Sequence, residues 1–436
     1  MPSTHPLRDA LHHEVHARPY ERLYAPLVLS HMAMVGNAGG AEREHLAALL
    51  SSRHLPVPAD DASHVGIDLG GLRLRWEKHG EFHTCTFWKQ LAGMPEGFDV
   101  LPLQDVPADW LHGLPGQWLV GLHVLVAPAS GPRDEPPPLV RQLLGEDSLV
   151  GARVMDDSAD VYTDFRLHAD GYARWIVVAG DVTPRRLGRL VQRLLEIETY
   201  RMMALIGLPV AREAGGALVG AERDLADVAE HIRTARPEDE PELLRRLTRL
   251  AADVEGLYAR THARFSASAA YFELVQRRID ELREDRLHNL QTLREFMDRR
   301  LMPAMQTCAW AARRQQALSE RISRVSNLLR TRVEIEQQQS SRELLDAMNR
   351  RQKAQLMLQS AVEGLSVAAV TYYGAGLVGY LAKGAKTVGI GVPPDLAVAV
   401  AIPLIAGAVW LGVRRLHHEA QAAATSDGEG TPRNHS

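Results

Sequence analysis

The stretch AVEGLSVAAVTYYGAGLVGYLAK, residues 361–383, decides the C-terminal architecture of this chain. It holds one acidic residue, Glu363, and at about 1.5 Å of rise per helical residue it is long enough to cross the hydrocarbon core of a membrane. A second stretch, LAVAVAIPLIAGAVWLGV at 396–413, carries no charge and ends before Arg414. Together they predict a transmembrane hairpin over 360–416; the alternative is a buried hairpin of a soluble protein.

Basic residues flank the predicted hairpin more on its outer sides than in its connection. Because basic flanks stay on the cytosolic side of a membrane, both chain ends are expected in the cytosol. The first 20 residues carry charges and prolines where a secretory signal has an apolar core, so no leader is predicted. Five basic residues lie on the outer flanks and two in the connection: Arg350, Arg351, Lys353, Arg414 and Arg415 outside, and Lys383 and Lys386 inside.

Residues 183–359 are predicted to form a long helical stalk. The segment is poor in glycine and strand-forming residues and rich in Leu, Ala, Arg, Glu and Gln, which favour helices. Two apolar series have the spacing of a coiled coil, and such helices pack either on their own domain or between copies of the chain. The series are Phe272, Val275, Ile279 and Leu282, and Leu318, Ile322, Val325 and Leu329; the expected breaks or kinks are Pro209, Pro237, Pro241 and Pro303.

Residues 1–182 differ in kind and predict a cytosolic α+β or α/β domain. Strand-like runs alternate with Gly, Pro and Asp, as at 27–36, which is followed by a predicted helix at 41–52. A Gly-Gly turn between two alternating runs further along indicates a meander. At the other end of the chain, the small polar residues of 420–436 predict a disordered tail.

Composition excludes several classes of protein. Among 436 residues, Lys and Arg number 50 and Asp and Glu 54, a net charge of −4, which lacks the basic footprint of a nucleic-acid-binding protein. The two cysteines, Cys85 and Cys308, lie far apart without metal-ligand spacing, so neither a disulfide framework nor a zinc site is predicted. Since no catalytic motif is found, we expect a protein that is not an enzyme and has no cofactor or metal.

The glycines of the first apolar stretch match a dinucleotide-binding pattern by spacing alone. Gly374, Gly376 and Gly379 fit GxGxxG, yet a second apolar stretch follows where a nucleotide-binding fold would continue. Small residues in this arrangement favour the close approach of membrane helices instead. Near the N-terminus, His12 and His16 share one helical face, which suits either a transition-metal site or an exposed amphipathic helix.

Polar side chains inside a predicted membrane span mark candidate functional residues, because each costs free energy in hydrocarbon. Glu363, Tyr373 and Gly374 lie in the first apolar stretch, where one helix face of an oligomer would line a pore. Glu363 alternatively lies at the membrane interface beside the preceding basic residues, where water solvates it.

Six segments carry a resemblance to a known family: EVHARP at 14–19, SLVGAR at 148–153, TDFRLH at 163–168, LEIETYRMMAL at 195–205, SRVSNLLRTR at 323–332 and VEGLSVAAVTYYGAGLVGYLAK at 362–383. They resemble a family of bacterial membrane-anchored proteins of unknown function. The resemblance implies the cytoplasmic membrane of a bacterium as the location. His16, Arg18 and Pro19 stand in its most recognisable motif, and the resemblance assigns them no role.

The order of elements is also similar to that of the CorA-type divalent-cation transporters, pentameric funnels whose first membrane span lines the pore. Their Gly-Met-Asn signature is absent here, and the connection carries Lys383 and Lys386 against one acid, Asp395, which would repel cations. The sequence therefore favours a membrane-anchored, oligomeric interaction or sensing protein that binds a cytosolic ligand or partner and associates through its stalk and membrane helices. The alternative is a CorA-like channel or transporter.

Overall fold

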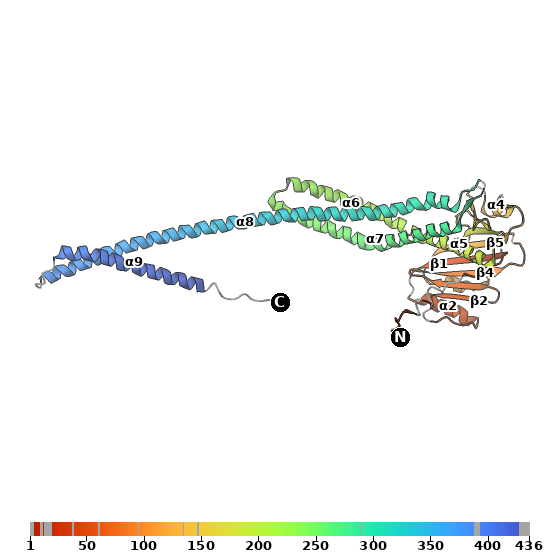
Figure 1. Ribbon diagram of the computed structural model, residues 1–436, viewed down its shortest axis with the longest axis horizontal. Helices are drawn as coiled ribbons and strands as arrows, with labels where there is room; N and C mark the ends of the chain where they lie inside the picture. The colour runs from red at the N-terminus through yellow and green to blue at the C-terminus, as the bar shows by residue number, and fades with distance from the viewer. Residues whose placement is uncertain are drawn as a thin grey trace. The chain divides into compact units, whose positions relative to one another are not determined.

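The computed structural model divides the chain into two compact units, Met1–Leu329 and Arg330–Ser436 (Figure 1). All strands described belong to the first unit, and helix α8 (Leu293–Thr387) begins there and continues into the second. The described residues are 4–8, 12, 20–36, 39–59, 62–94, 96–133, 135–145, 148–287, 289–387 and 393–426, with only the backbone described at 385–387 and 416–426.

The first unit is built on one sheet, which has nine strands among the described residues. Of the neighbouring pairs described, only β5 and β8 are parallel, so the architecture is α+β rather than α/β. The strand order is β2-β3-β4-β1-β5-β8-β7-β6-β9. The strands are β1 Leu27–Val35, β2 His64–Asp68, β3 Arg73–Lys78, β4 Phe82–Gln90, β5 Gln117–Pro128, β6 Val150–Val154, β7 Ala159–Thr163, β8 Ala173–Ala179 and β9 Asp285–Arg286.

Short helices cover one face of the β1–β4 half of the sheet. In β3, Leu74 and Trp76 point to this face because successive strand side chains alternate. They share a core with Phe87 of β4 and with Leu46 and Leu50 of the predicted first helix, and all five are 1% exposed or less. The elements are α2 Ala41–Ser52, η1 Pro102–Asp105 and α3 Ala108–His112; α4 Pro138–Leu144 packs in a separate cluster with β7 and β8.

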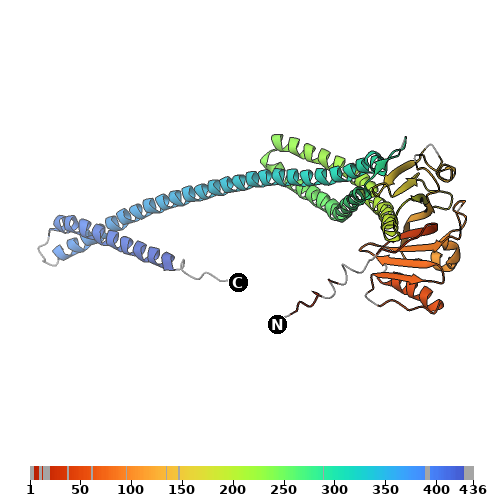
Figure 2. The same ribbon diagram turned by 45° about the vertical axis from the view of Figure 1, so that its right-hand side comes forward.

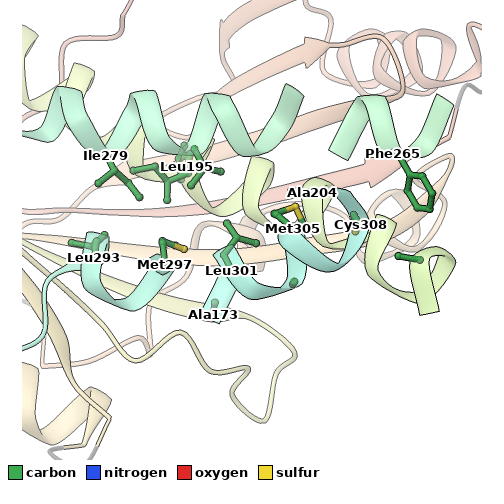
Figure 3. Close-up of a cluster of buried hydrophobic side chains, with 14 of the residues drawn as sticks. Ala173, Leu195, Ala204, Phe265, Ile279, Leu293, Met297, Leu301, Met305 and Cys308 are labelled. Carbon is green, nitrogen blue, oxygen red and sulfur yellow. The ribbon is translucent and has the colours of Figure 1, made fainter. Parts of the chain in front are cut away.

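Long helices cover the other face of the sheet. Thr183 caps the first of them, α5, by accepting a hydrogen bond from the Arg186 backbone N–H at 3.4 Å. Figure 3 shows side chains of three helices meeting in one layer, among them Leu195 of α5, Ile279 of α7 and Leu301 of α8. In Figures 1 and 2, α6, α7 and the first part of α8 run side by side. The elements are α5 Pro184–Leu205, α6 Gly207–Thr234, η2 Pro237–Asp239 and α7 Glu240–Leu282.

The two coiled-coil-like series pack within the chain in the first unit. Val275, Ile279 and Leu282, and likewise Leu318, Ile322 and Leu329, are buried in the core that the sheet and helices share; Phe272 and Val325 lie half-buried against it.

Of the break or kink expected at Pro303, the break does not occur. Pro303 lies inside α8, between Leu301 and Met305, which are both buried. An interior proline costs about 3 kcal/mol, and we attribute the continued helix to burial of these neighbours. The other three prolines lie at or within one turn of helix boundaries.

The second unit contains two apolar helices packed on each other. A Cβ built on Gly374 of α8 would lie 3.1 Å from the Ile405 side chain of α9 (Pro394–Ser426), and one built on Gly379 would lie 3.0 Å from Val398. The tail is helical as far as Ser426, which corrects the expectation of disorder from residue 420; alanine-rich sequence favours helix there. Residues 427–436 lie outside the described residues.

By length and composition, three helical segments among the described residues are apolar enough to cross a membrane. An 18-residue window of Leu293–Gly384 has a mean hydropathy of 1.4, and 6% of that window is buried. The corresponding window of Pro394–Arg415 has a mean hydropathy of 2.4, and none of it is buried. The third, Pro184–Thr234, was not expected from the sequence; its window of mean hydropathy 1.4 is 33% buried inside the first unit.

Candidate functional site

A cavity of about 380 Å³ lies between the sheet and helix α5 in the first unit. Strands β1, β3 and β4 form its floor and α5 its roof, with Arg278 of α7 and the segment at 20–23 at its sides. Gly188 allows that segment to approach, because a Cβ there would lie 1.8 Å from the Glu21 carbonyl oxygen. The cavity is lined mainly by polar and charged side chains.

A row of polar side chains crosses the floor. In the sheet register, Arg75 of β3 pairs with Thr86 of β4, and Thr86 pairs with His31 of β1. Two residues further along β3, and therefore on the same face, Glu77 pairs with Thr84 of β4. Because paired residues point to the same face, all five side chains face α5, and each of them lines the cavity.

Helix α5 presents a matching polar line. Gln192, Glu196 and Thr199 are four and three residues apart, so they share one helix face. The Arg75 guanidinium donates to Gln192 Oε1 at 2.9 Å, and Thr199 Oγ1 lies 3.0 Å from His31 Nε2. Gln192 Nε2 in turn donates to Glu196 Oε1 at 2.9 Å. The first two of these hydrogen bonds join α5 to the sheet, and the third orients Gln192 within α5.

His31 is held neutral between two hydroxyls. Its Nδ1 lies 2.8 Å from Thr86 Oγ1, and burial lowers the pKa of the imidazole to about 4. A neutral imidazole carries one N–H and one accepting nitrogen. One of the two threonine hydroxyls that bond His31, those of Thr86 and Thr199, therefore accepts from the ring. The hydrogen of that hydroxyl is available to another acceptor.

Two pairs of opposite charges border the cavity. Arg75 donates to Glu77 Oε1 at 2.8 Å; burial raises the pKa of Glu77, but Arg75 more than offsets this, so the pKa lies below its ordinary value. Burial likewise lowers the pKa of Arg278, but Glu196, to which it donates, and Glu281 raise it above its ordinary value. The site thus holds ionised groups of both signs.

Thr84 supplies an unused polar atom at the same floor. Its Oγ1 is buried and has no hydrogen-bond partner among the described residues. Buried hydroxyls nearly always have a partner, so this atom indicates that a ligand or water belongs in the cavity. The arrangement can bind a small polar molecule through hydroxyls, guanidinium groups and carboxylates.

A histidine flanked by a serine and an aspartate also occurs, but the histidine and the serine are both buried. Ser30 Oγ lies 2.9 Å from His123 Nδ1, whereas Asp170 lies 3.8 Å from Nε2, beyond hydrogen-bond distance. Ser30 is 0% exposed, so its hydroxyl is shielded from solvent. Burial lowers the pKa of His123 to about 4. In the part of the chain that the structure describes, no group of three or more His, Cys, Asp or Glu is placed to hold a metal ion.

The residues singled out in the sequence lie elsewhere. His16, Arg18 and Pro19 lie outside the described residues, which resume at Tyr20 on the cavity wall. In the second unit, Gly374 and Gly379 lie against α9. Gly376 faces open space, and Tyr373 is 76% exposed. Glu363 accepts a hydrogen bond from Gln359 at 3.1 Å.

The sequence analysis missed the cavity residues, because they come from four separated segments. One signal was present in β3, where Arg73, Arg75 and Glu77 alternate with Leu74 and Trp76. Such alternation ordinarily predicts a face exposed to water. Only the structure shows that α5 covers it.

Comparison with known proteins identifies the family. Residues 3–420 match the family described as Protein of unknown function (DUF3422). The chain belongs to this family. No curated protein and no solved structure matches it.

Proposed function

We propose that this DUF3422 member is a non-enzymatic binding protein anchored in the cytoplasmic membrane of a bacterium. Its cytosolic α+β unit binds a small polar molecule that carries charges of both signs. The observation that carries this proposal is the polar cavity, which is lined by Arg75, Arg278, Glu77 and Glu196 together with Thr84, whose hydroxyl has no partner among the described residues. Its volume of about 380 Å³ lies within the range of small-molecule sites.

The exposed surface of the second unit supports membrane anchoring. Leu365, Leu377 and Leu404 are 74%, 64% and 67% exposed, and Tyr372, Tyr380 and Trp410 are more than half exposed. Leaving a large apolar side chain in water costs about 1.5–3 kcal/mol relative to burial. A bilayer removes this cost for both helices at once, and the arginines outside the two spans support an orientation with both chain ends in the cytosol.

We further propose that copies of the chain associate through α8 and the membrane helices. The part of α8 at 330–358 supports this, because its side chains are almost all exposed although several of them are apolar. An isolated helix gains little stability from its own hydrogen bonds, so a partner is expected. The ion-pathway alternative has less support, because Gly374 lies against Ile405 of its own chain.

Ligand binding is tested by a thermal-shift panel of zwitterionic amino acids and short peptides on the detergent-solubilised full chain. We expect at least one to stabilise the protein, and Thr84→Trp to abolish the shift by filling the cavity. Thr248→Trp, on an exposed residue of α7, is the control that retains the shift. A shift that survives Thr84→Trp, or its absence throughout the panel, would contradict the proposed ligand class.

Anchoring and assembly are tested separately. A variant lacking residues 361–413 should leave the membrane fraction on alkaline carbonate extraction, while the full chain stays. An impermeant maleimide applied outside spheroplasts should label Gly384→Cys but not Ser340→Cys; the reverse pattern would refute the orientation. The mass of the full chain in mild detergent should exceed that of one copy, and a closed ring of five would favour the channel alternative.

A further inference from the structure

A second cavity of the first unit lies where three segments that carry the family resemblance meet. It has a volume of about 690 Å³ and is bounded by the start of β6, the β7–β8 connection, the end of α5 and the first turns of α8. The segments at 148–153, 163–168 and 195–205 each contribute to its wall. We propose that this cavity, here called the arginine cleft, binds the phosphate group of a phosphorylated small molecule.

Three guanidinium groups in the arginine cleft lack an anionic partner. Arg166, Arg299 and Arg300 line it and are exposed, and no carboxylate of the described residues lies within ion-pair distance of them. The fourth, Arg201, is already neutralised by Glu198, to which it donates at 2.5 and 3.1 Å. Guanidinium groups bind phosphate by paired hydrogen bonds, and a phosphate offers enough oxygens for several of them.

Among the described residues, Asp164 is the one acid that lines the arginine cleft, and its own loop engages it. Asp164 is buried; its Oδ2 lies 3.0 Å from His168 Nε2, and its Oδ1 accepts from the Arg166 backbone N–H at 3.1 Å. Phe165 between them has a φ of +51°, a conformation that L residues other than glycine seldom adopt. The loop is therefore held in a strained form that sets Arg166 at the cleft, and such strain is typical of binding sites.

Aromatic rings supply the apolar part of the wall. Phe165 and Phe296 stack with centroids 4.1 Å apart and planes 15° from parallel, and both line the cleft. Leu205, Leu290 and Met297 extend this surface. A ligand with a phosphate and a flat or apolar remainder matches the three arginines and this wall, whereas inorganic phosphate uses the arginines alone.

The test is isothermal titration calorimetry on the full chain in detergent, with phenyl phosphate and inorganic phosphate as probes. We expect phenyl phosphate to bind more tightly. Arg299→Gln should weaken both probes about tenfold or more, since each charge-assisted hydrogen bond contributes that much. Phe296→Leu should reduce the difference in affinity between phenyl phosphate and inorganic phosphate. Arg313→Gln, an exposed arginine further along α8, is the matched control and should change neither.

Titrations in lipid nanodiscs distinguish a soluble phosphorylated ligand from a lipid headgroup. Phosphatidic acid, added as a minor component to phosphatidylcholine, should leave phenyl phosphate binding unchanged if the natural ligand is soluble. Displacement of phenyl phosphate, lost with Arg299→Gln, would assign the phosphate to a lipid headgroup. If neither probe binds, or if Arg299→Gln and Arg313→Gln behave alike, the phosphate site is refuted. The amino-acid shifts that test the first cavity do not depend on these arginines.

Discussion

Replacing Arg75 with methionine should destabilise the first unit far more than replacing a surface arginine. Arg75 is 6% exposed and holds Glu77, whose side chain is 13% exposed, and Gln192 on the opposite side of the cavity. Methionine keeps much of the volume and removes the charge. The Glu77 carboxylate would then remain enclosed without the guanidinium that stabilises it.

The expected loss follows from this enclosure. Removing one partner of a buried ion pair costs about 3–5 kcal/mol, mainly because the remaining charge stays desolvated. Arg245→Met removes one partner of an exposed pair, Arg245 with Glu242 at 2.6 Å, and such pairs contribute about 0–1 kcal/mol. Arg75→Met with Glu77→Leu should recover most of the loss, since no buried charge is left unpaired.

The contribution of Glu77 to the free energy of unfolding depends on pH with opposite signs in the native protein and in Arg75→Met. In the native protein, Arg75 holds the pKa of Glu77 below its ordinary value, so its contribution is present above that value and is lost as pH falls. Without Arg75, burial raises the pKa of Glu77, so the native state binds a proton more readily than the unfolded chain. The deficit of Arg75→Met should therefore shrink as pH falls from about 7 to about 5.

Urea unfolding of the full chain in detergent, followed by tryptophan fluorescence, measures these changes. Trp76, beside Arg75 in β3, is 1% exposed and reports on this part of the sheet. The reasoning is refuted by a loss below about 1 kcal/mol, or by a double variant no more stable than Arg75→Met. A deficit that grows on acidification would refute the electrostatic account specifically.

Three further predictions concern other parts of the chain. Gly188→Ala should cost about 1–3 kcal/mol in urea unfolding, because the new Cβ would meet the Glu21 carbonyl oxygen at 1.8 Å; an unchanged midpoint would contradict the tight approach. Burial raises the pKa of Glu284 to about 7, so its contribution to stability is present below its unfolded pKa and falls as pH rises through 7. Glu284→Gln should flatten the stability profile between about pH 5 and 8, and an unaltered slope would assign it to another group. Gly379→Cys with Val398→Cys should form a disulfide within one chain under mild oxidation, seen as a mobility shift on non-reducing gels, while cross-linking only between chains would refute the hairpin packing.

Much of the fold follows from local patterns in the sequence. The strand expected at 27–36 is β1, and the helix expected at 41–52 is α2. Both have strong local signals, an apolar run of strand-forming residues in the first and a helix after two glycines in the second. The pairing of β5 with β8 has no such signal, since parallel strands are joined by long connections that local patterns do not describe.

The cavity could not be predicted, because its polar residues have ordinary local explanations. Arg75 and Glu77 resemble the solvent face of an edge strand, and Gln192, Glu196 and Thr199 resemble the polar side of a helix. Whether these polar residues face solvent or line a cavity depends on which helix covers which strands. A polar line on α5 amid buried Leu190, Val191 and Leu194 is the one hint that the sequence offers, and it names no partner.

The order of the two units along the chain also determines when each is synthesised. Every described strand and the last buried residue of the first unit, Leu329, precede the first apolar stretch, which begins about 30 residues later. At the usual rates of translation, about 5–20 residues per second, this exposed part of α8 takes about 2–6 seconds to make. The first unit thus has an interval to complete its sheet before hydrophobic segments emerge. Shortening 330–360 would remove that interval while leaving every described strand and both apolar stretches intact.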